Sequence, residues 1–410
     1  MINIVIGAGL LALPGLAVKQ AGHFAFLAWL VCAFLALPVL TVFIILGRKF
    51  PNAGGIAHFA QTAFGRNAYA ATSLIFLGAV AFGLPSIALT GGYYAALVVG
   101  GSPHVIALIL LVAATLVHVL SSDLVARANM VLAGAILVFL IALVAIGFAS
   151  LDTPLGIDRI PFLPSLNEVP VVFAPFMMIF FAFTGWEVAA GLSEEFQNSR
   201  RDFPRAMIAS FLITTALYLL VAYVVQRQSL SADYEVAFTQ IVANYLGTLG
   251  IITTSIVATV IVFANLSGAI WAVSRLVFSL SREGFLPTVL KKTKGGTPWP
   301  AVVATASTLA IVLAFDRAGW LGLDTMLHLA GQNFLVLYGI AAAVLFAQSV
   351  VAAERALAAA VVLIVLGLVT VQGLAALYPA ALFVIGWLLT GWKPVAIAAV
   401  VPHRIQRNKS

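Results

Sequence analysis

The chain has 410 residues, of which 63% are hydrophobic and only 9% are charged. Soluble domains carry roughly 25% charged residues, and a water-soluble fold of this size cannot hide so much apolar surface. The composition therefore excludes an ordinary soluble protein. The net charge of +7 would suggest nucleic acid as a partner, but this interpretation fails once the basic residues are placed along the chain.

Long apolar runs recur along the whole sequence, and runs of roughly 18 or more such residues are typical of membrane-spanning helices. We predict about twelve spans, the first ending near Lys19. The others are expected at 24–46, 68–98, 104–120, 127–149, 171–194, 206–225, 239–280, 300–315, 323–347, 355–375 and 377–393. The span at 239–280 is too long to lie wholly in lipid, so we expect its end to project into water or to break near Ser274.

The basic residues gather on one side of this predicted arrangement, as the positive-inside rule requires. With a cytoplasmic N-terminus, the outside keeps only Lys19, Arg159, Arg227 and Arg317 of the 21 Lys and Arg residues. The other 17 (21 − 4) fall inside, some of them in a basic tail at 394–410. The basic excess is thus topological. We expect no nucleic-acid partner, and both termini are predicted to be cytoplasmic.

Two short amphipathic stretches indicate an internal symmetry. Residues 57–65 lead into the span at 68–98, and residues 237–247 lead into the span at 239–280. By the predicted topology, the first stretch is cytoplasmic and the second is external. Matching elements on opposite faces, five helices apart, are what an inverted five-plus-five repeat would produce.

Two spans carry interruptions at corresponding places under this repeat. The first span contains Gly7, Ala8 and Gly9, and the span at 171–194 contains Phe183, Thr184, Gly185 and Trp186. Glycine lowers helix propensity by about 1 kcal/mol relative to alanine, although small residues also simply pack membrane helices together. The correspondence favours two broken helices. A broken helix survives in a bilayer only beside a cavity or a ligand.

The backbone groups freed by two such breaks would suit a zwitterion. The N–H groups of residues 9–11 would start the second half of the first helix, and their positive dipole end suits a carboxylate. The carbonyl groups near 6–8 and 181–184 would suit an ammonium group. The backbone alone can therefore bind the constant part of an α-amino acid.

Glu187 is the one acidic residue that we place inside the membrane, where a carboxylate is costly and is by default a functional candidate. Three roles remain open: a structural acceptor that holds the break, a proton-coupling site, and direct contact with the substrate ammonium. Polar side chains at similar depth are candidates for helix contacts or for the substrate path; they are Asn265, Ser267, Gln332 and Asn333. No nucleotide-binding, metal-ligand or catalytic-triad pattern appears. We therefore predict no enzyme activity, no metal and no cofactor.

The stretch from Phe181 through Glu187 to Ala206 resembles the helix 6 signature of the amino acid–polyamine–organocation transporter superfamily. The first span, with Ile6, Gly7–Gly9 and Pro14, is similar to the first-helix glycine motif of that family. Residues 46–59 look most like the branch that exports L-methionine and branched-chain amino acids in bacteria.

The resemblance implies an all-α membrane protein with a LeuT-type fold in one transmembrane domain, 1–393. Two inverted five-helix repeats (about 1–149 and 171–347) would be followed by two C-terminal helices at about 355–393. Residues Gly7–Gly9 would meet the carboxylate of the substrate, and Phe183–Trp186 would meet the ammonium and close over the side chain. Phe82 and Pro85 would belong to an apolar wall that favours apolar side chains.

Two departures from the family pattern matter. The span at 127–149 has no lysine, so the coupling device of some proton-driven members is missing. Met1 lies only six residues before Gly7, so we expect the native N-terminus to extend further.

The sequence thus predicts a secondary transporter of neutral apolar L-amino acids, such as methionine, leucine, isoleucine and valine. It would work by alternating access in the bacterial cytoplasmic (inner) membrane, and export is the favoured direction. An importer or exchanger is the alternative within transport, and a channel or sensor is the alternative from another class. The scattered polar residues disfavour a channel. Proton coupling stays open, and the oligomeric state is not predicted.

Overall fold

The computed structural model describes residues 8–50, 55–120, 122–151, 163–191, 193, 196, 198–231 and 233–389. Throughout these residues the regular structure is helical, apart from one isolated bridge between Lys294 and Thr297. The part that precedes residue 152 contains η1 (Ala8–Leu11), α2 (Leu13–Ala21), η2 (Gly22–Phe24), α3 (Ala25–Lys49), α4 (Gly55–Phe64), α5 (Arg66–Val99), α6 (Pro103–Leu120) and α7 (Ser122–Ala149).

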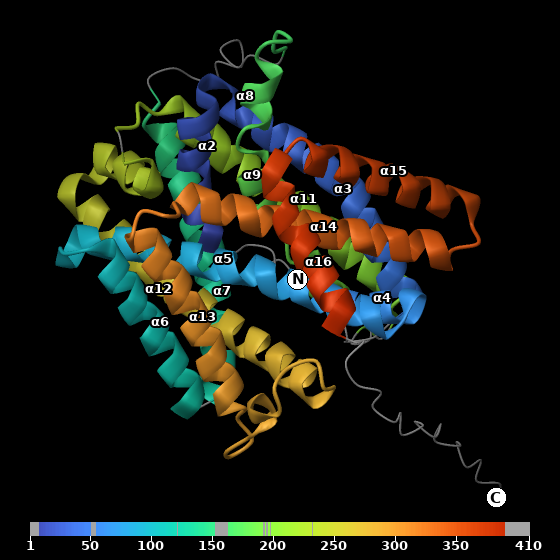
Figure 1. Cartoon of the computed structure of the whole chain (residues 1–410). Helices are drawn as coiled ribbons and strands as arrows, with labels where there is room; N and C mark the ends of the chain where they lie inside the picture. Colours follow the sequence, from blue (N-terminus) through green and yellow to red (C-terminus); the bar gives the residue numbers. More distant parts are fainter. Residues whose placement is uncertain are drawn as a thin grey trace, which may run out of the picture.

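The part that follows residue 162 begins with three short helices and continues with long ones (Figure 1). They are α8 (Val169–Phe173), α9 (Phe176–Ala182), α10 (Trp186–Gly191), α11 (Asp202–Arg227), η5 (Tyr234–Val236), α12 (Ala237–Arg282), η6 (Thr288–Lys291), α13 (Trp299–Arg317), α14 (Leu323–Gln348), α15 (Ala352–Thr370), η7 (Gly373–Ala376) and α16 (Leu377–Leu388).

Eight helical stretches of the described residues are long and apolar enough to cross a membrane. They are Leu13–Lys49, Arg66–Val99, Val169–Ala190, Asp202–Arg227, Tyr234–Arg282, Trp299–Arg317, Leu323–Gln348 and Ala352–Thr370. Shorter apolar helices occupy Pro103–Val117, Ile136–Ala149 and Gly373–Leu388. The chain is therefore a multi-pass membrane protein. Each predicted span has a helical counterpart here, but twelve crossings stay a prediction.

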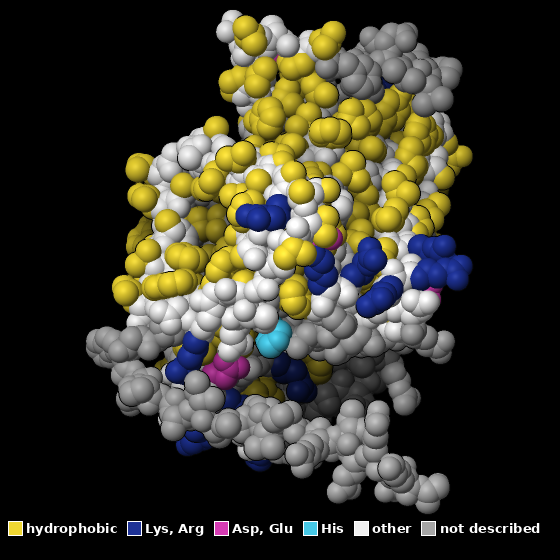
Figure 2. Space-filling model, turned by 90° about the vertical axis from the view of Figure 1, so that its right-hand side faces the viewer, with side chains coloured by type: hydrophobic (Ala, Val, Ile, Leu, Met, Phe, Trp, Pro, Cys, Tyr) yellow, Lys and Arg dark blue, Asp and Glu magenta, His cyan; other side chains and the backbone are white. Residues whose placement is uncertain are grey.

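The surface agrees with a lipid environment. Figure 2 views the molecule from the right-hand side of Figure 1, and apolar side chains cover the upper part of this face. Lys and Arg side chains gather in its lower half. An apolar belt bordered by basic residues is the pattern that a bilayer and its headgroups require.

The long helix α12 corrects one of two predicted alternatives. We expected its end to project into water or to break near Ser274. The helix runs through Ser274, whose hydroxyl donates to the Trp271 carbonyl at 3.0 Å, so a break there is wrong, and the projection into water stays a prediction. The kink lies instead at Gly247, with φ 58° and ψ −143°. A left-handed φ is cheap for glycine because it has no Cβ. Residues 237–246 thus form a short arm before the long segment 248–282, as α4 forms one before α5.

Helix α5 lies at the centre of the bundle. In its most apolar 18-residue window 72% of the residues are buried, against 17% for α15. Glycines let three neighbours approach it closely. A Cβ on Gly78 would lie 2.2 Å from Leu382 of α16, one on Gly91 would lie 2.5 Å from Val262 of α12, and one on Gly92 would meet α6. Small residues at such crossings allow the close packing that membrane helices depend on.

We predict that Gly92→Ala lowers the free energy of unfolding by about 1–3 kcal/mol. The added methyl group would collide with the backbone of α6, which cannot move aside as a flexible side chain can. The new Cβ would lie 2.2 Å from the carbonyl oxygen of Pro103. Gly367→Ala on α15 is the matched control, since a Cβ there meets no atom within 4 Å. Thermal unfolding in detergent should show a lower Tm for Gly92→Ala alone. Equal Tm values for both variants would contradict this account of the α5–α6 contact.

Candidate functional site

The predicted interruption in the span at 171–194 is confirmed. Helix α9 ends at Ala182 and α10 begins at Trp186. Between them, the Phe183 N–H bonds to the Phe180 carbonyl at 2.9 Å, and the Thr184 hydroxyl donates to the Phe181 carbonyl at 2.8 Å. Gly185 has φ 108°, a backbone angle that residues with a Cβ atom rarely adopt. The break is therefore built into the local sequence.

Glu187 is buried, and its hydrogen bonds connect the backbone of this break to Tyr338 of α14. Its carboxylate accepts the Gly185 N–H at 3.0 Å and the hydroxyl of Tyr338. The Tyr338 oxygen in turn accepts the same Gly185 N–H at 3.2 Å. These contacts are those of a structural acceptor, the first of the three roles considered above. Proton coupling and contact with a substrate stay predictions.

The first span begins with a tightened turn. Residues 8–11 form a 3₁₀-helix rather than an α-helix, and α2 starts only at Leu13. The Ala12 N–H bonds to the Gly9 carbonyl at 3.3 Å. Ala8 and Gly9 are both buried, whereas Gly7 lies outside the described residues. The irregular backbone therefore reaches at least from Ala8 to Ala12.

The side chain of Phe181 connects the two irregular segments. A Cβ on Gly9 would lie 3.1 Å from Cε1 of this ring, and a Cβ on Gly83 of α5 would lie 2.9 Å from Cε2 on its other edge. The Phe334 ring of α14 lies 6.0 Å away, centroid to centroid. The first span, α5, α9 and α14 thus converge on one half-buried ring.

Sequence reasoning considered only the carbonyl of Phe181 and missed its side chain. The sequence offered one signal, an aromatic residue two positions before the interruption at Phe183. That its ring meets Gly9 and Gly83 could not be read from the sequence.

Phe183 and Trp186, which we predicted to close over a substrate, point to other helices. Phe183 has its ring centroid 5.4 Å from Tyr218 and 6.1 Å from Trp29, and Trp186 lies 5.7 Å from Phe211. These neighbours belong to α3 and α11, not to α5 or α14. Thr184 is half-buried beside the break. The assignment of these residues to a substrate stays a prediction.

The two residues of the predicted apolar wall on α5, Phe82 and Pro85, have different surroundings. Phe82 packs edge-to-face on Tyr378 of α16, with centroids 5.3 Å apart. Pro85 is buried inside the helix. The neighbouring Gly83 is the α5 residue that faces Phe181. Phe82 therefore lies against a peripheral helix, and the small residue next to it borders the candidate site.

Two amide side chains on α14 each carry one atom without a hydrogen-bond partner among the described residues. Gln332 and Asn333 are both buried, and the Asn333 amide donates to the Leu329 carbonyl at 2.7 Å. Gln332 Nε2 and Asn333 Oδ1 have no hydrogen-bond partner among the described residues. An unpaired buried polar group costs about 1–3 kcal/mol, and a hydrogen bond to a ligand would remove this cost. On α12, Ser267 is buried and Asn265 is half-buried.

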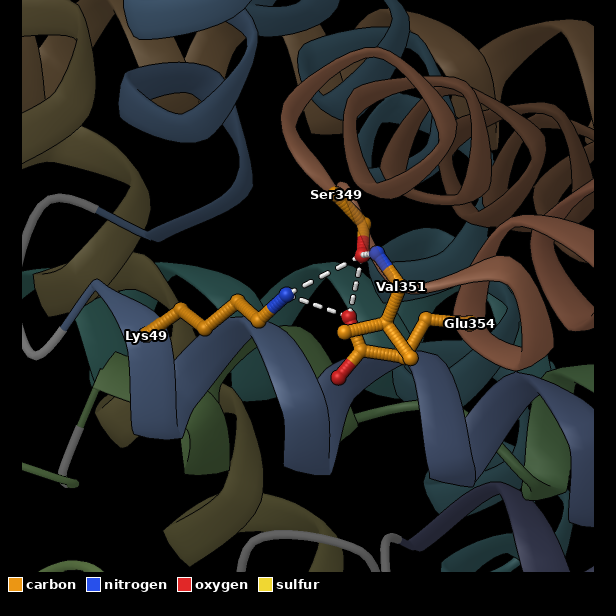
Figure 3. Close-up of polar contacts among 4 residues, drawn as sticks. All are labelled: Lys49, Ser349, Val351 and Glu354. Atoms are coloured by element: carbon orange, nitrogen blue, oxygen red, sulfur yellow. Dashed lines mark hydrogen bonds and ion pairs between the residues drawn. The ribbon is translucent and has the colours of Figure 1, made fainter.

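Ion pairs connect the ends of α2 and α3 to residues on or next to α14. At one end, Lys19 Nζ lies 3.4 Å from Glu235 and 3.6 Å from Asp324. At the other end, shown in Figure 3, Lys49 at the end of α3 pairs with Glu354 and donates to the Ser349 hydroxyl at 3.2 Å. The region around Phe181 therefore lies between two charged clusters, each at an end of the bundle.

The fold and the site together define a class: a multi-pass helical membrane protein with a helix broken inside the bundle. Residues 1–402 match the family model of the amino acid permeases, so the chain belongs to this family. The predicted resemblance to the amino acid–polyamine–organocation superfamily is confirmed.

Individual relatives extend this match over most of the chain. The chain is 30% identical over 348 residues to the uncharacterized amino acid permease YecA of Bacillus subtilis, covering 82% of this chain and 80% of that protein. It is 29% identical over 341 residues to the L-methionine/branched-chain amino acid exporter YjeH of Escherichia coli, with the same coverage. It is also 31% identical to the human large neutral amino acids transporter small subunit 2, over 43% of this chain and 33% of that protein.

We predict that Tyr338→Phe lowers stability by about 1–3 kcal/mol, because it leaves Glu187 and Gly185 without a shared partner. Tyr378→Phe is the matched control, since its hydroxyl makes one 3.2 Å bond to the Gly78 carbonyl. Thermal unfolding of the detergent-solubilised variants should show the larger loss for Tyr338→Phe. If the two variants unfold alike, Tyr338 does not hold the break.

Proposed function

We propose that the protein is a secondary transporter that carries neutral apolar L-amino acids across the bacterial cytoplasmic membrane by alternating access. The observation that carries this proposal is the helix break at Phe183–Gly185, held by Glu187 and Tyr338. Non-helical backbone at membrane depth is tolerated where it lines a cavity or a ligand site. Membership of the amino acid permease family supports amino acids as the substrates.

The two poles of the amino acid would be bound by peptide groups. The N–H groups at Gly7, Ala8 and Gly9 would hold the carboxylate, and carbonyl groups in 181–184 would hold the ammonium. The irregular turn at Ala8–Leu11 supports this assignment, and the ring of Phe181 lies between the two segments. The side chain of the substrate would then extend toward Phe181 and the α14 amides.

The LeuT-type architecture is part of the same proposal. The short helix α4 before α5 and the arm 237–246 before the rest of α12 support two inverted repeats, at about 1–149 and 171–347. Helices α15 and α16 would be the two additional ones, within one transmembrane domain at 1–393. Both termini and the tail 394–410 would be cytoplasmic. Binding would close the first and sixth spans around the zwitterion, and a four-helix bundle would rock against the remaining scaffold.

The proposed direction of transport and range of substrates are based on a relative of this chain. The relative YjeH is named as an exporter of L-methionine and branched-chain amino acids. We therefore propose methionine, leucine, isoleucine and valine as substrates, and export as the direction. Exchange of similar amino acids is the alternative within transport.

Reconstitution in liposomes tests the proposal. Counterflow of labelled methionine should saturate and should be inhibited by leucine, isoleucine and valine, with and without a pH gradient. Net efflux of methionine with no amino acid on the opposite side of the membrane would distinguish export from exchange, because an exchanger requires a counter-substrate there. A flux that never saturates would indicate a channel and would overturn the carrier proposal.

We predict that Phe181→Leu shifts the preference toward larger side chains, because a smaller residue enlarges the space between Gly9 and Gly83. One methylene group in an apolar pocket changes specificity by about tenfold or more. The ratio of kcat/KM for phenylalanine to that for valine should rise by about tenfold. Phe176→Leu, on the same helix α9 but packed against Phe173 and Phe180, is the control and should leave this ratio unchanged. Equal shifts of the ratio in both variants would contradict the placement of Phe181 at the substrate.

The coupling hypothesis for Glu187 makes a separate prediction. Glu187→Gln keeps an acceptor oxygen for Gly185 and Tyr338 but cannot exchange a proton. We expect binding of methionine to be largely preserved, whereas the dependence of transport on pH is lost. Binding is measured by protection against thermal unfolding, and transport by counterflow at several pH values. An unchanged pH dependence would leave Glu187 with the structural role alone.

A further inference from the structure

The last turns of α12 carry two arginines and two aromatic residues on one face. Trp271, Arg275, Phe278 and Arg282 follow one another at spacings of four, three and four residues, which places them in line along a helix. The Arg275 guanidinium carbon lies 4.2 Å from the centroid of the Trp271 ring, and that of Arg282 lies 5.7 Å from the Phe278 centroid. We call these four residues the α12 stripe.

The α12 stripe faces outward from the bundle. Arg275 and Arg282 are exposed, and Trp271 is 42% exposed despite its size. The same face of the helix continues toward Gly247 with exposed Leu249, Ile256 and Val260. Such a row of apolar side chains at the surface of a membrane protein is in contact with lipid. The α12 stripe therefore extends a lipid-facing surface.

The length of α12 places the stripe at the level of the headgroups. The segment after Gly247 has 35 residues (282 − 247), which span about 52 Å at 1.5 Å each. A bilayer is about 40–45 Å thick with its headgroups. The helix thus passes through a whole headgroup layer. Arg282 is its last residue, and Arg275 lies about 10 Å before it.

Within the part of the chain that the structure describes, the guanidinium groups of the two stripe arginines have no hydrogen-bond or ion-pair partner. The ion pairs among the described residues involve Lys19, Lys49 and His104 instead. The nearest acidic residue in sequence, Glu283, accepts from the hydroxyls of Tyr69 and Ser279. Stacking on a ring uses the flat face of a guanidinium and leaves its N–H edge open for a bidentate oxyanion.

We propose that the α12 stripe binds the phosphate of an anionic phospholipid headgroup, with Trp271 and Phe278 packed against the glycerol and upper acyl chain. The positive surroundings support an anion. Arg66 stacks on Phe285 at 4.7 Å just beyond the helix, and Lys291 ends the following 3₁₀-helix. Basic clusters at the edge of a membrane span attract anionic lipids. In the topology proposed above, this is the cytoplasmic leaflet.

The site is tested on the purified full-length protein without any transport assay. Delipidated protein in neutral detergent is titrated with phosphatidylglycerol, phosphatidylcholine or inorganic phosphate, and bound lipid is counted by native mass spectrometry. We expect phosphatidylglycerol to bind and the other two probes to bind at least tenfold more weakly. Each juxtamembrane arginine contributes roughly a fivefold change in affinity, so R275Q/R282Q should weaken phosphatidylglycerol binding by about 25-fold.

Two control variants separate this site from general charge attraction. R355Q removes another exposed arginine that stacks on a ring, Phe346 at 4.6 Å, but lies outside the α12 stripe; it should leave the binding unchanged. R275K/R282K keeps both charges without the planar fork and should give an intermediate loss. Equal losses in R355Q and R275Q/R282Q, or full binding in R275Q/R282Q, would overturn the proposal. Tight binding of inorganic phosphate would identify a soluble anion as the ligand and would overturn it as well.

Discussion

The absence of water in a bilayer core is the constraint on which this structure depends, because each backbone N–H and C=O there must find a partner inside the protein. The interruption between α9 and α10 frees several such groups at once. The hydroxyl of Thr184, the carboxylate of Glu187 and the hydroxyl of Tyr338 bond to the backbone there. Thr184 belongs to the break itself, Glu187 to the first turn of α10 and Tyr338 to α14. Stabilising the break thus requires the burial of the Glu187 carboxyl group, which is unfavourable in free energy.

Close helix contact is the second requirement, and small residues meet it. Gly83 and Gly9 admit the ring of Phe181 from two sides, and Gly331 lets the backbone of α14 approach that of α9, where a Cβ would lie 1.8 Å from the Met177 carbonyl. The same helix α14 supplies Tyr338 to the break and carries two polar atoms without a partner among the described residues, Gln332 Nε2 and Asn333 Oδ1. The candidate site is therefore bounded by backbone and aromatic rings more than by charged side chains.

The ion pairs of Lys19 and Lys49 lie at the ends of the bundle instead of at the candidate site. Lys19 with Glu235 and Asp324, and Lys49 with Glu354, join separate helices at opposite ends. Arginines use aromatic faces, as the α12 stripe and the pair of Arg355 with Phe346 show. This division follows from solvation, since a charge is inexpensive at the headgroup level and costly in hydrocarbon.

Sequence patterns were sufficient to predict the membrane class, the positions of the helices within a few residues, the break at Phe183–Gly185 and the superfamily. Each of these depends on local composition: apolar length, a glycine that needs φ 108°, or a continuous motif. The tertiary structure alone decided that α12 kinks at Gly247 and not near Ser274, that Phe183 and Trp186 turn toward α3 and α11, and that Phe181 meets Gly9 and Gly83. These features depend on how each helix is rotated about its axis. That rotation is set by packing against helices far away in the chain, which no local pattern encodes.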